Sequence, residues 1–523
     1  MTRRRLLLLA LLAAGPATAA SGTPPAPAEP GPQVPRFEDA SGALPGPPHA
    51  YAGGWEHFVG GGVAVFDCNG DARPDIVAAG GTAPARLYVN ASAPGAMAFT
   101  AGVLPALGET TGVWPLDIDG DGRLDLAVLS VGTNHLLRGD GACGFADASA
   151  DWSFDGGDRW STAFSATFEA GRDHPTLAIG NYVDRTDPAG PFEACDVNAL
   201  YRWEGAGYAP PVTLEPGFCA LSMLFSDHAR RGTADLRVSN DRHYYVRGGS
   251  EQMWHMPGLT PMGPEDGFDP VSIWGMGIAS RDLTGDGLPE IVLTSMGDQL
   301  MMLAEPGGWR PAPYSIGTYA QRPFLGDDGR PSTGWHAEFA DVNNDALADL
   351  FIAKGNVDQM PTNAMEDPNN LLLQRADGTF EEAADRAGIA TVERARGAAL
   401  EDFDGDGALD LVVVNRRAPL ELWRNAGVAG RAVRVEVRQD GPNPFAVGAF
   451  VERRRPDGTL EPVEITVGGG HGGGRAGPVH FGIADADAAQ IRVVWPDGTA
   501  SPFVSVAAGR AVLHRTATGI DLR

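Results

Sequence analysis

The sequence predicts an all-β fold: a seven-bladed β-propeller with calcium-binding loops, followed by a small all-β C-terminal domain. Three observations predict this fold. An acidic nine-residue loop occurs five times, four short apolar strands accompany the loops, and the composition changes near Gly427. With 523 residues, the chain is long enough for several domains.

The acidic loops are the first observation, and each carries mainly acidic or amide side chains at positions 1, 3, 5 and 9. Ca²⁺ prefers six to eight oxygen ligands, and glycine lets the chain curl around an ion. A turn alone needs one Asp or Asn, whereas clustered carboxylates repel one another unless a cation lies among them. With position 7 included, the predicted metal-site residues are Asp67, Asn69, Asp71, Arg73, Asp75, Asp117, Asp119, Asp121, Arg123, Asp125, Asp282, Thr284, Asp286, Leu288, Glu290, Asp341, Asn343, Asp345, Leu347, Asp349, Asp402, Asp404, Asp406, Ala408 and Asp410.

We expect four or five Ca²⁺ ions per chain. The loops at 117 and 402 match the pattern best, Asn replaces one Asp in the loops at 67 and 341, and Thr284 and Glu290 depart from it. The acid at position 9, instead of a Glu at position 12, argues against an EF-hand.

The spacing of the loops predicts seven repeats. The gap between residues 117 and 282 is about three times the other spacings, so two altered copies are expected inside it. One runs from Asp227 to Asp235 with Arg231 at position 5, and the other has Arg172 at the matching place. Two interpretations stay open: a guanidinium replaces the metal charge, or these are ordinary turns.

Four short strands per repeat are typical of a propeller blade. Segments 62–66 and 410–414 illustrate the strands on either side of a loop, and 421–425 illustrates the third strand. Segment 36–40 resembles a fourth strand but precedes the first loop, and no such strand follows Asn425. We therefore expect segment 36–40 to complete the seventh blade and leave no open edge.

Composition and the N-terminal residues predict an exported protein. A formal net charge of −27 argues against nucleic-acid binding. A basic start, a short apolar core and a small-residue cleavage pattern predict a signal peptide over 1–20, and 21–35 is a Pro-rich linker. No later stretch could span a membrane. We expect a periplasmic or secreted location.

Four cysteines allow three disulfide pairings. We favour Cys195–Cys219 and, by default, Cys68–Cys143. The alternative is that Cys68, which occupies position 2 of a loop, is a free thiol.

The sequence divides into a propeller over 36–427 and a β domain over 428–523, where alternating strands and Pro-Asp-Gly turns replace the acidic repeats. Residues 468–474 surround His471 with six glycines. This segment is either a flexible binding loop with His471 as a ligand or a mobile connector.

These motifs resemble known families. The acidic repeats resemble FG-GAP/VCBS repeats, and 467–470, 480–483 and 494–499 resemble the ASPIC/UnbV domain. Together they are similar to the cartilage acidic protein family and its bacterial relatives. The resemblance implies an exported calcium-binding seven-bladed propeller.

The leading functional interpretation is a non-enzymatic binding or adhesion module whose partner is an unknown protein or glycan. No common catalytic motif occurs. The alternative is an exported enzyme or transition-metal handler at the propeller axis, using His57, His336 and Glu338. Soft thioethers could hold Cu(I) or simply fill the core; the methionines concerned are Met253, Met256, Met262, Met276, Met296, Met301 and Met302, and His255 lies among them in the sequence.

Overall fold

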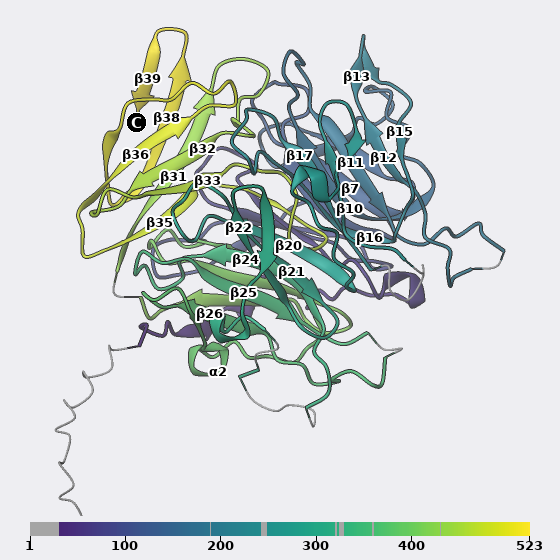
Figure 1. Cartoon of the computed structure of the whole chain (residues 1–523), viewed down its shortest axis with the longest axis horizontal. Helices are drawn as coiled ribbons and strands as arrows, with labels where there is room; N and C mark the ends of the chain where they lie inside the picture. The colour runs from purple at the N-terminus through teal and green to yellow at the C-terminus, as the bar shows by residue number, and fades with distance from the viewer. Residues whose placement is uncertain are drawn as a thin grey trace, which may run out of the picture. The chain divides into compact units, whose positions relative to one another are not determined.

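The computed structural model describes residues 31–188, 190–241, 248–319, 322–323, 329–357, 360–428 and 430–523. The predicted signal peptide and most of the predicted linker lie outside these residues. Figure 1 shows the blades in purple to green and the C-terminal domain in yellow.

Seven antiparallel units of four strands make up the propeller, as predicted. The strands of the first four blades are β2 (Val63–Phe66), β3 (Asp75–Ala78), β4 (Arg86–Asn90) and β5 (Phe99–Ala101); β6 (Thr110–Leu116), β7 (Asp125–Gly132), β8 (His135–Gly139) and β9 (Phe145–Asp147); β10 (Arg159–Thr167), β11 (Thr176–Asn181), β12 (Asn198–Tyr201) and β15 (Val212–Leu214); and β16 (Ala220–Ser226), β17 (Asp235–Asn240), β18 (Gln252–His255) and β19 (Thr260–Pro261).

The last three blades consist of β20 (Gly275–Arg281), β21 (Glu290–Ser295), β22 (Leu300–Glu305) and β23 (Gly308–Pro311); β24 (Gly334–Ala340), β25 (Asp349–Lys354), β26 (Asn370–Gln374) and β27 (Phe380–Glu382); and β28 (Ala395–Glu401), β29 (Asp410–Asn415), β30 (Glu421–Asn425) and β1 (Phe37–Asp39). Short elements between strands are η1 (Ser41–Ala43), η2 (Trp55–His57), the β13–β14 hairpin (Trp203–Glu204, Gly207–Tyr208), η3 (Pro264–Asp266), η4 (Tyr314–Ile316) and α2 (Ala384–Ala387).

The ring closes as the sequence predicts. β1 pairs antiparallel with β30, and Phe37 lies opposite Asn425. The innermost strand of each blade contacts the innermost strand of the next, and β28 contacts β2. The N-terminal strand therefore covers the edge that blade seven would otherwise expose.

The innermost strands are buried because they face a neighbouring blade on each side. β6, β16 and β28 are buried at every position. Between blades two and three, the rings of Trp114 and Phe164 pack with centroids 5.4 Å apart. Full burial of an aromatic side chain of this kind contributes about 1.5–3 kcal/mol.

The C-terminal domain consists of two four-stranded sheets. Their strands are β31 (Arg431–Gln439), β35 (Val479–Ala484), β38 (Gly509–Thr516) and β39 (Gly519–Leu522), and β32 (Phe450–Arg454), β33 (Leu460–Glu464), β36 (Ala488–Val494) and β37 (Val504–Ala507). A short strand, β34 (Arg475–Ala476), pairs instead with β2 of the first blade. The chain therefore leaves this domain between β33 and β35 and enters the propeller.

Candidate metal centres and the propeller axis

Each acidic loop links the first and second strands of a blade, and the Asp at position 1 organises the turn. In the loop at 117, Asp117 accepts hydrogen bonds from the backbone N–H groups of Gly120 and Gly122, both at 2.8 Å. These two glycines have φ angles of 74° and 82°, which favour glycine. In the loops at 67, 282 and 402, the position-1 Asp likewise accepts N–H bonds from positions 4 and 6. In the loop at 341, it accepts the bond from position 6.

The carboxylate at position 9 is buried behind the turn. Asp125 accepts N–H bonds from Ile118 at 2.8 Å and from Gly139 of the third strand at 2.9 Å. Burial, with the nearby Asp119 and Asp117, raises the pKa of Asp125 to about 8. The pKa of Asp75 is raised to about 7, again mainly by burial. In the protein without a bound cation, burial therefore makes the ionised forms of Asp75 and Asp125 energetically unfavourable.

Two loops bring three carboxylates to one point. Oxygens of Asp117, Asp119 and Asp125 lie within 4.8 Å of one another, and so do those of the second set, Asp402, Asp404 and Asp410. A hard divalent cation fits this donor set, and the residue at position 7 can add its backbone carbonyl oxygen. These two loops are the strongest candidate calcium centres.

The other three loops differ. Among the described residues, they do not gather three carboxylates within that distance. In the loop at 341, the Asn343 amide donates to Asp345 at 2.9 Å and to the carbonyl of Gln33 at 3.0 Å. Burial and the Asp345 charge raise the pKa of Asp341 to about 8. Because the carboxylates of Asp341 and Asp345 still interact unfavourably in this loop, it remains a candidate calcium site.

Arginines supply part of the counter-charge. Arg138 on the third strand of blade two lies 3.0 Å from Asp119. In blade seven, Arg424 occupies the corresponding place, 2.6 Å from Asp404. Arg434 of the C-terminal domain lies 2.6 Å from Asp402. The loop at 402 thus has a counter-ion from each domain.

The altered loops use arginine in different ways. In blade four, Asp227 keeps the turn by accepting N–H bonds from Arg231 and Gly232, and the Arg231 guanidinium pairs with Asp235. In blade three, Arg172 lies 4.0 Å from Glu169, whereas Arg202 lies 2.6 Å from the same carboxylate. The guanidinium interpretation therefore describes blade four, while in blade three a different arginine makes the close pair.

Residues 467–476, here called the plug, fill the propeller axis. Backbone hydrogen bonds join the plug to five successive inner strands, β2, β6, β10, β16 and β20, at 2.7–3.4 Å. Arg475 reaches β24 and β28 through ion pairs with Glu338 at 3.3 Å and Glu401 at 3.2 Å. Neither expectation for this segment, a flexible binding loop or a mobile connector, describes it, because its backbone is paired along most of its length.

His471 lies at the tip of the plug and is fully buried. Its Nε2 accepts the N–H of Gly60 at 3.2 Å, and its ring lies 4.9 Å from that of Trp335. Burial, with the charge of Arg396, lowers the pKa of His471 to about 3, so the ring is neutral. Its contacts are structural.

The three residues proposed for a site at the axis, His57, His336 and Glu338, do not form one cluster. His336 Nε2 lies 3.6 Å from Glu338, and His336 Nδ1 accepts the N–H of His471 at 3.2 Å. His57 pairs instead with Glu109 at 3.1 Å. His336 and Glu338 do meet, beside a cavity of about 270 Å³ where the plug enters.

The methionines do not gather into one site. Met253 and Met262 pack with Phe268, and Met276 and Met296 belong to a separate cluster around Trp335. Met256, Met301 and Met302 lie in three further clusters. They serve as core side chains.

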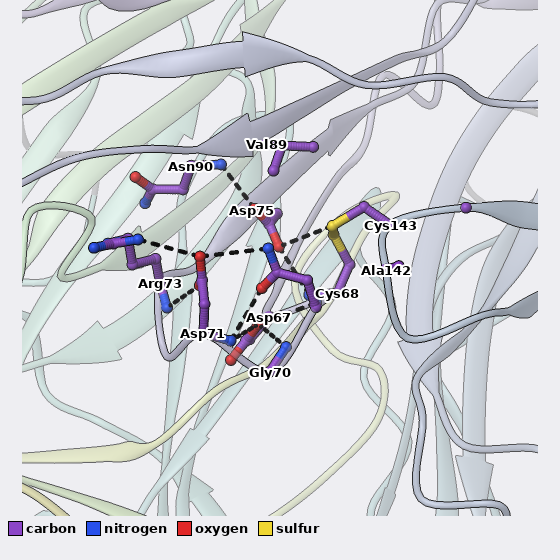
Figure 2. The surroundings of a disulfide bond; sticks show 12 residues. Asp67, Cys68, Gly70, Asp71, Arg73, Asp75, Val89, Asn90, Ala142 and Cys143 are labelled. Atoms are coloured by element: carbon purple, nitrogen blue, oxygen red, sulfur yellow. Dashed lines mark hydrogen bonds and ion pairs between the residues drawn. A yellow bond between two sulfur atoms is a disulfide. The ribbon is translucent and has the colours of Figure 1, made fainter.

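Both favoured disulfides form. Cys68 pairs with Cys143, and Cys195 with Cys219. The alternative of a free Cys68 thiol is wrong. Figure 2 shows the first pair beside the loop at 67, where it joins blade one to blade two.

Sequence reasoning missed the plug, although its glycines carried a signal. A Cβ atom on Gly62 would lie 1.5 Å from the carbonyl oxygen of Gly472, and one on Gly112 would lie 2.3 Å from it. On the plug side, a Cβ on Gly473 would lie 2.0 Å from the Val63 carbonyl oxygen. Glycines on inner strands together with a glycine run elsewhere in the chain indicate two backbones in close contact.

Comparisons with known proteins agree with these motifs. The family model described as ASPIC and UnbV matches residues 439–519, and that of the FG-GAP-like repeat matches 67–128 and 341–413. Cartilage acidic protein 1 of Mus musculus is 25% identical over 480 residues, covering 84% of this chain and 70% of that protein. The Homo sapiens protein is 24% identical, covering 84% and 69%.

Solved structures show weaker likeness. BBS1N, in its crystal structure in complex with ARL6DN, is 9% identical with a TM-score of 0.45, covering 75% of this chain and 98% of that one. AofleA from Arthrobotrys oligospora is 12% identical with a TM-score of 0.38, covering 66% and 88%. At these TM-scores the likeness says nothing of function. The chain thus contains FG-GAP-like repeats and a segment that matches the ASPIC and UnbV model, and over most of its length it is similar to cartilage acidic protein 1.

Proposed function

We propose that this chain is an exported, calcium-stabilised propeller that acts as a binding or adhesion module and carries no catalytic site. The calcium part of the proposal depends on the convergence of Asp402, Asp404 and Asp410, all three buried. Buried like charges are costly unless a counter-ion offsets them. Ca²⁺ would supply that charge and hold the turn, with Arg424 and Arg434 neutralising the rest.

The filled axis supports binding rather than catalysis. The plug occupies the central channel, and His336 and Glu338 already contact one another and the plug. A protein or glycan partner would then meet the outer surfaces of the blades or of the C-terminal domain. The two disulfides support export, because such bonds persist in oxidising compartments. In the described part of the chain, no helix has the length and apolar character needed to cross a membrane.

Elemental analysis and calcium titration of the purified protein test the metal part. We expect four or five Ca²⁺ per chain, and Asp119→Ala and Asp404→Ala should each lose one. Asp485→Ala is the matched control, because Asp485 is exposed and outside the loops. Unchanged stoichiometry in both loop variants would refute the assignment.

Binding to immobilised glycans and secreted proteins, with and without chelator, tests the functional part. A partner should be retained in calcium and lost on chelation by the wild type, and bound weakly by an Asp119→Ala/Asp404→Ala double variant. Catalytic turnover that is abolished by His336→Ala in a folded protein would contradict the non-enzymatic role.

A further inference from the structure

The altered loops of blades three and four border a cavity of about 310 Å³, here called the altered-loop cavity, which the C-terminal domain covers. Ligand pockets in proteins have volumes of about 300–1,000 Å³. The altered-loop cavity therefore has room for a small molecule or for one side chain of a partner. It is lined by residues of segments 167–170, 227–234 and 256–257 of the propeller and of 447–450, 464 and 494–498 of the C-terminal domain.

The floor of the altered-loop cavity is apolar. Met256, Val447, Phe450 and Trp495 line it, and all four side chains are buried. Thr233 of blade four also lines the cavity but is exposed, so the cavity opens to solvent. A ligand with a carbon chain would remove apolar surface from water on this floor.

The charges on the wall are mostly negative. Glu169 pairs with Arg202 at 2.6 Å, and Arg230 pairs with Glu452 of the C-terminal domain. Among the described residues, no basic side chain forms an ion pair with Asp227 or Glu464. The cavity therefore keeps two carboxylates without a cationic partner. Its charged lining residues are Glu169, Asp227, Arg230 and Glu464.

Glu464, the last residue of β33, also lines the cavity beside the plug, so its carboxylate lies between the two cavities. It accepts the Ser226 hydroxyl at 2.5 Å and the Asp227 N–H at 2.8 Å. These bonds fix the carboxylate but bring no positive charge, and its oxygens keep further lone pairs. Burial, with the nearby Asp227, raises the pKa of Glu464 to about 7. A cation in the cavity would stabilise the ionised form.

We propose that the altered-loop cavity binds one alkylammonium group, whose charged head pairs with Glu464 and whose carbon chain packs on Met256, Phe450 and Trp495. A compact ammonium with three donors suits a carboxylate that has free lone pairs beside an apolar floor. A divalent metal suits the cavity less, because the described residues here do not bring three ligands together as the loops at 117 and 402 do.

The same chemistry is found in a free amine and in the lysine side chain of a protein partner. The lysine source rests on the binding role proposed above, whereas the free amine does not. A tripeptide, acetyl-Gly-Lys-Gly-amide, and its Nε-acetylated form distinguish the two. Peptide binding that is lost on acetylation assigns the cavity to a lysine side chain, and binding of the free amine alone assigns it to a small amine.

Calorimetric titration with n-butylammonium chloride in saturating Ca²⁺ tests the site itself. We expect one butylammonium per chain, bound about tenfold or more tighter than n-butanol, which has the same chain without the charge. Glu464→Gln should weaken butylammonium binding about tenfold or more. Glu265→Gln is the matched control and should leave it unchanged, because Glu265 is exposed and outside the cavity lining.

Asp227→Asn removes the second unpaired charge and keeps an oxygen for the turn, so it serves if Glu464→Gln does not fold. It should weaken butylammonium binding about threefold. No butylammonium binding by the wild type, or wild-type affinity in the folded Glu464→Gln or Asp227→Asn variant, would overturn the proposal. Such a result would leave calcium-dependent partner capture untouched, so the two proposals fail separately.

Discussion

Replacing His471 by alanine should loosen the plug without unfolding the blades. The imidazole is fully buried, accepts the N–H of Gly60 at 3.2 Å and packs on Trp335. Leaving a buried N–H unpaired costs about 1–3 kcal/mol, and the space left by the ring adds a cavity penalty. We take about 3 kcal/mol as the total for His471→Ala.

Because every 1.4 kcal/mol is a factor of ten, the open plug should become about a hundredfold more populated. Hydrogen exchange followed by mass spectrometry reports this population at the amides of Gly469 and Gly470, which donate to Met223 and Ile278 at 2.7 Å. For a chain of this size the same free energy lowers Tm by about 3 °C.

His514→Ala is the matched control, since His514 lies on β38 and pairs with the exposed Asp440. It should leave exchange in the plug unchanged and shift Tm by less than about 0.5 °C. If His471→Ala exchanges as slowly as the wild type and melts like His514→Ala, the structural role of His471 is wrong.

Three further predictions concern the loops, pH and closure. Asp119→Ala and Asp404→Ala should lower Tm in calcium more than Asp227→Ala, because only the first two lose a proposed metal ligand; equal shifts would remove the distinction between intact and altered loops. In excess chelator, Tm should rise as the pH falls from 8 to 6.5: the position-9 carboxylates have folded pKa values above their unfolded values, so the folded state binds more protons in this window, and saturating Ca²⁺ should flatten the trend. Below pH 6.5 the buried His471 and His480, whose folded pKa values are lowered, act in the opposite sense, because they favour the unfolded state. The test is therefore restricted to pH 8–6.5. A Tm that decreases in calorimetry as the pH is lowered through this window would contradict the carboxylate explanation. Deleting residues 34–42 should expose β30 and cause aggregation in size-exclusion chromatography, whereas deleting 21–33 should not; a stable monomer lacking 34–42 would refute ring closure by β1.

The C-terminal domain is joined to the propeller more closely than a division of the sequence at residue 427 suggests. Its strands form their own core around Val435 and Ile491, as the alternating pattern predicts. The plug, however, joins this domain to the inner strands, and residues 32–523 form one compact unit. A chain truncated at 427 would lose the plug and expose Gly62, Val63 and Gly112 at the axis.

The sequence by itself determined the repeat, the acidic loops and the strand that closes the ring. These features are local: the spacing of Asp, Asn and Gly defines a turn, and alternating apolar residues define the strands beside it. The placement of segment 36–40 in the seventh blade followed from counting strands in each repeat. Of the two cysteine pairs, Cys195–Cys219 was favoured and Cys68–Cys143 followed by default.

Only the tertiary structure decided what occupies the axis, whereas the sequence already ranked first the two loops, at 117 and 402, in which three carboxylates come together. The glycine segment around His471 has no side-chain period to predict its conformation, and the hydrogen bond between His471 and Gly60 joins residues 411 positions apart. The ion pair between Asp402 and Arg434 likewise joins the loop at 402 to the C-terminal domain. Contacts of this kind depend on how separate elements pack, and local sequence pattern does not specify that packing.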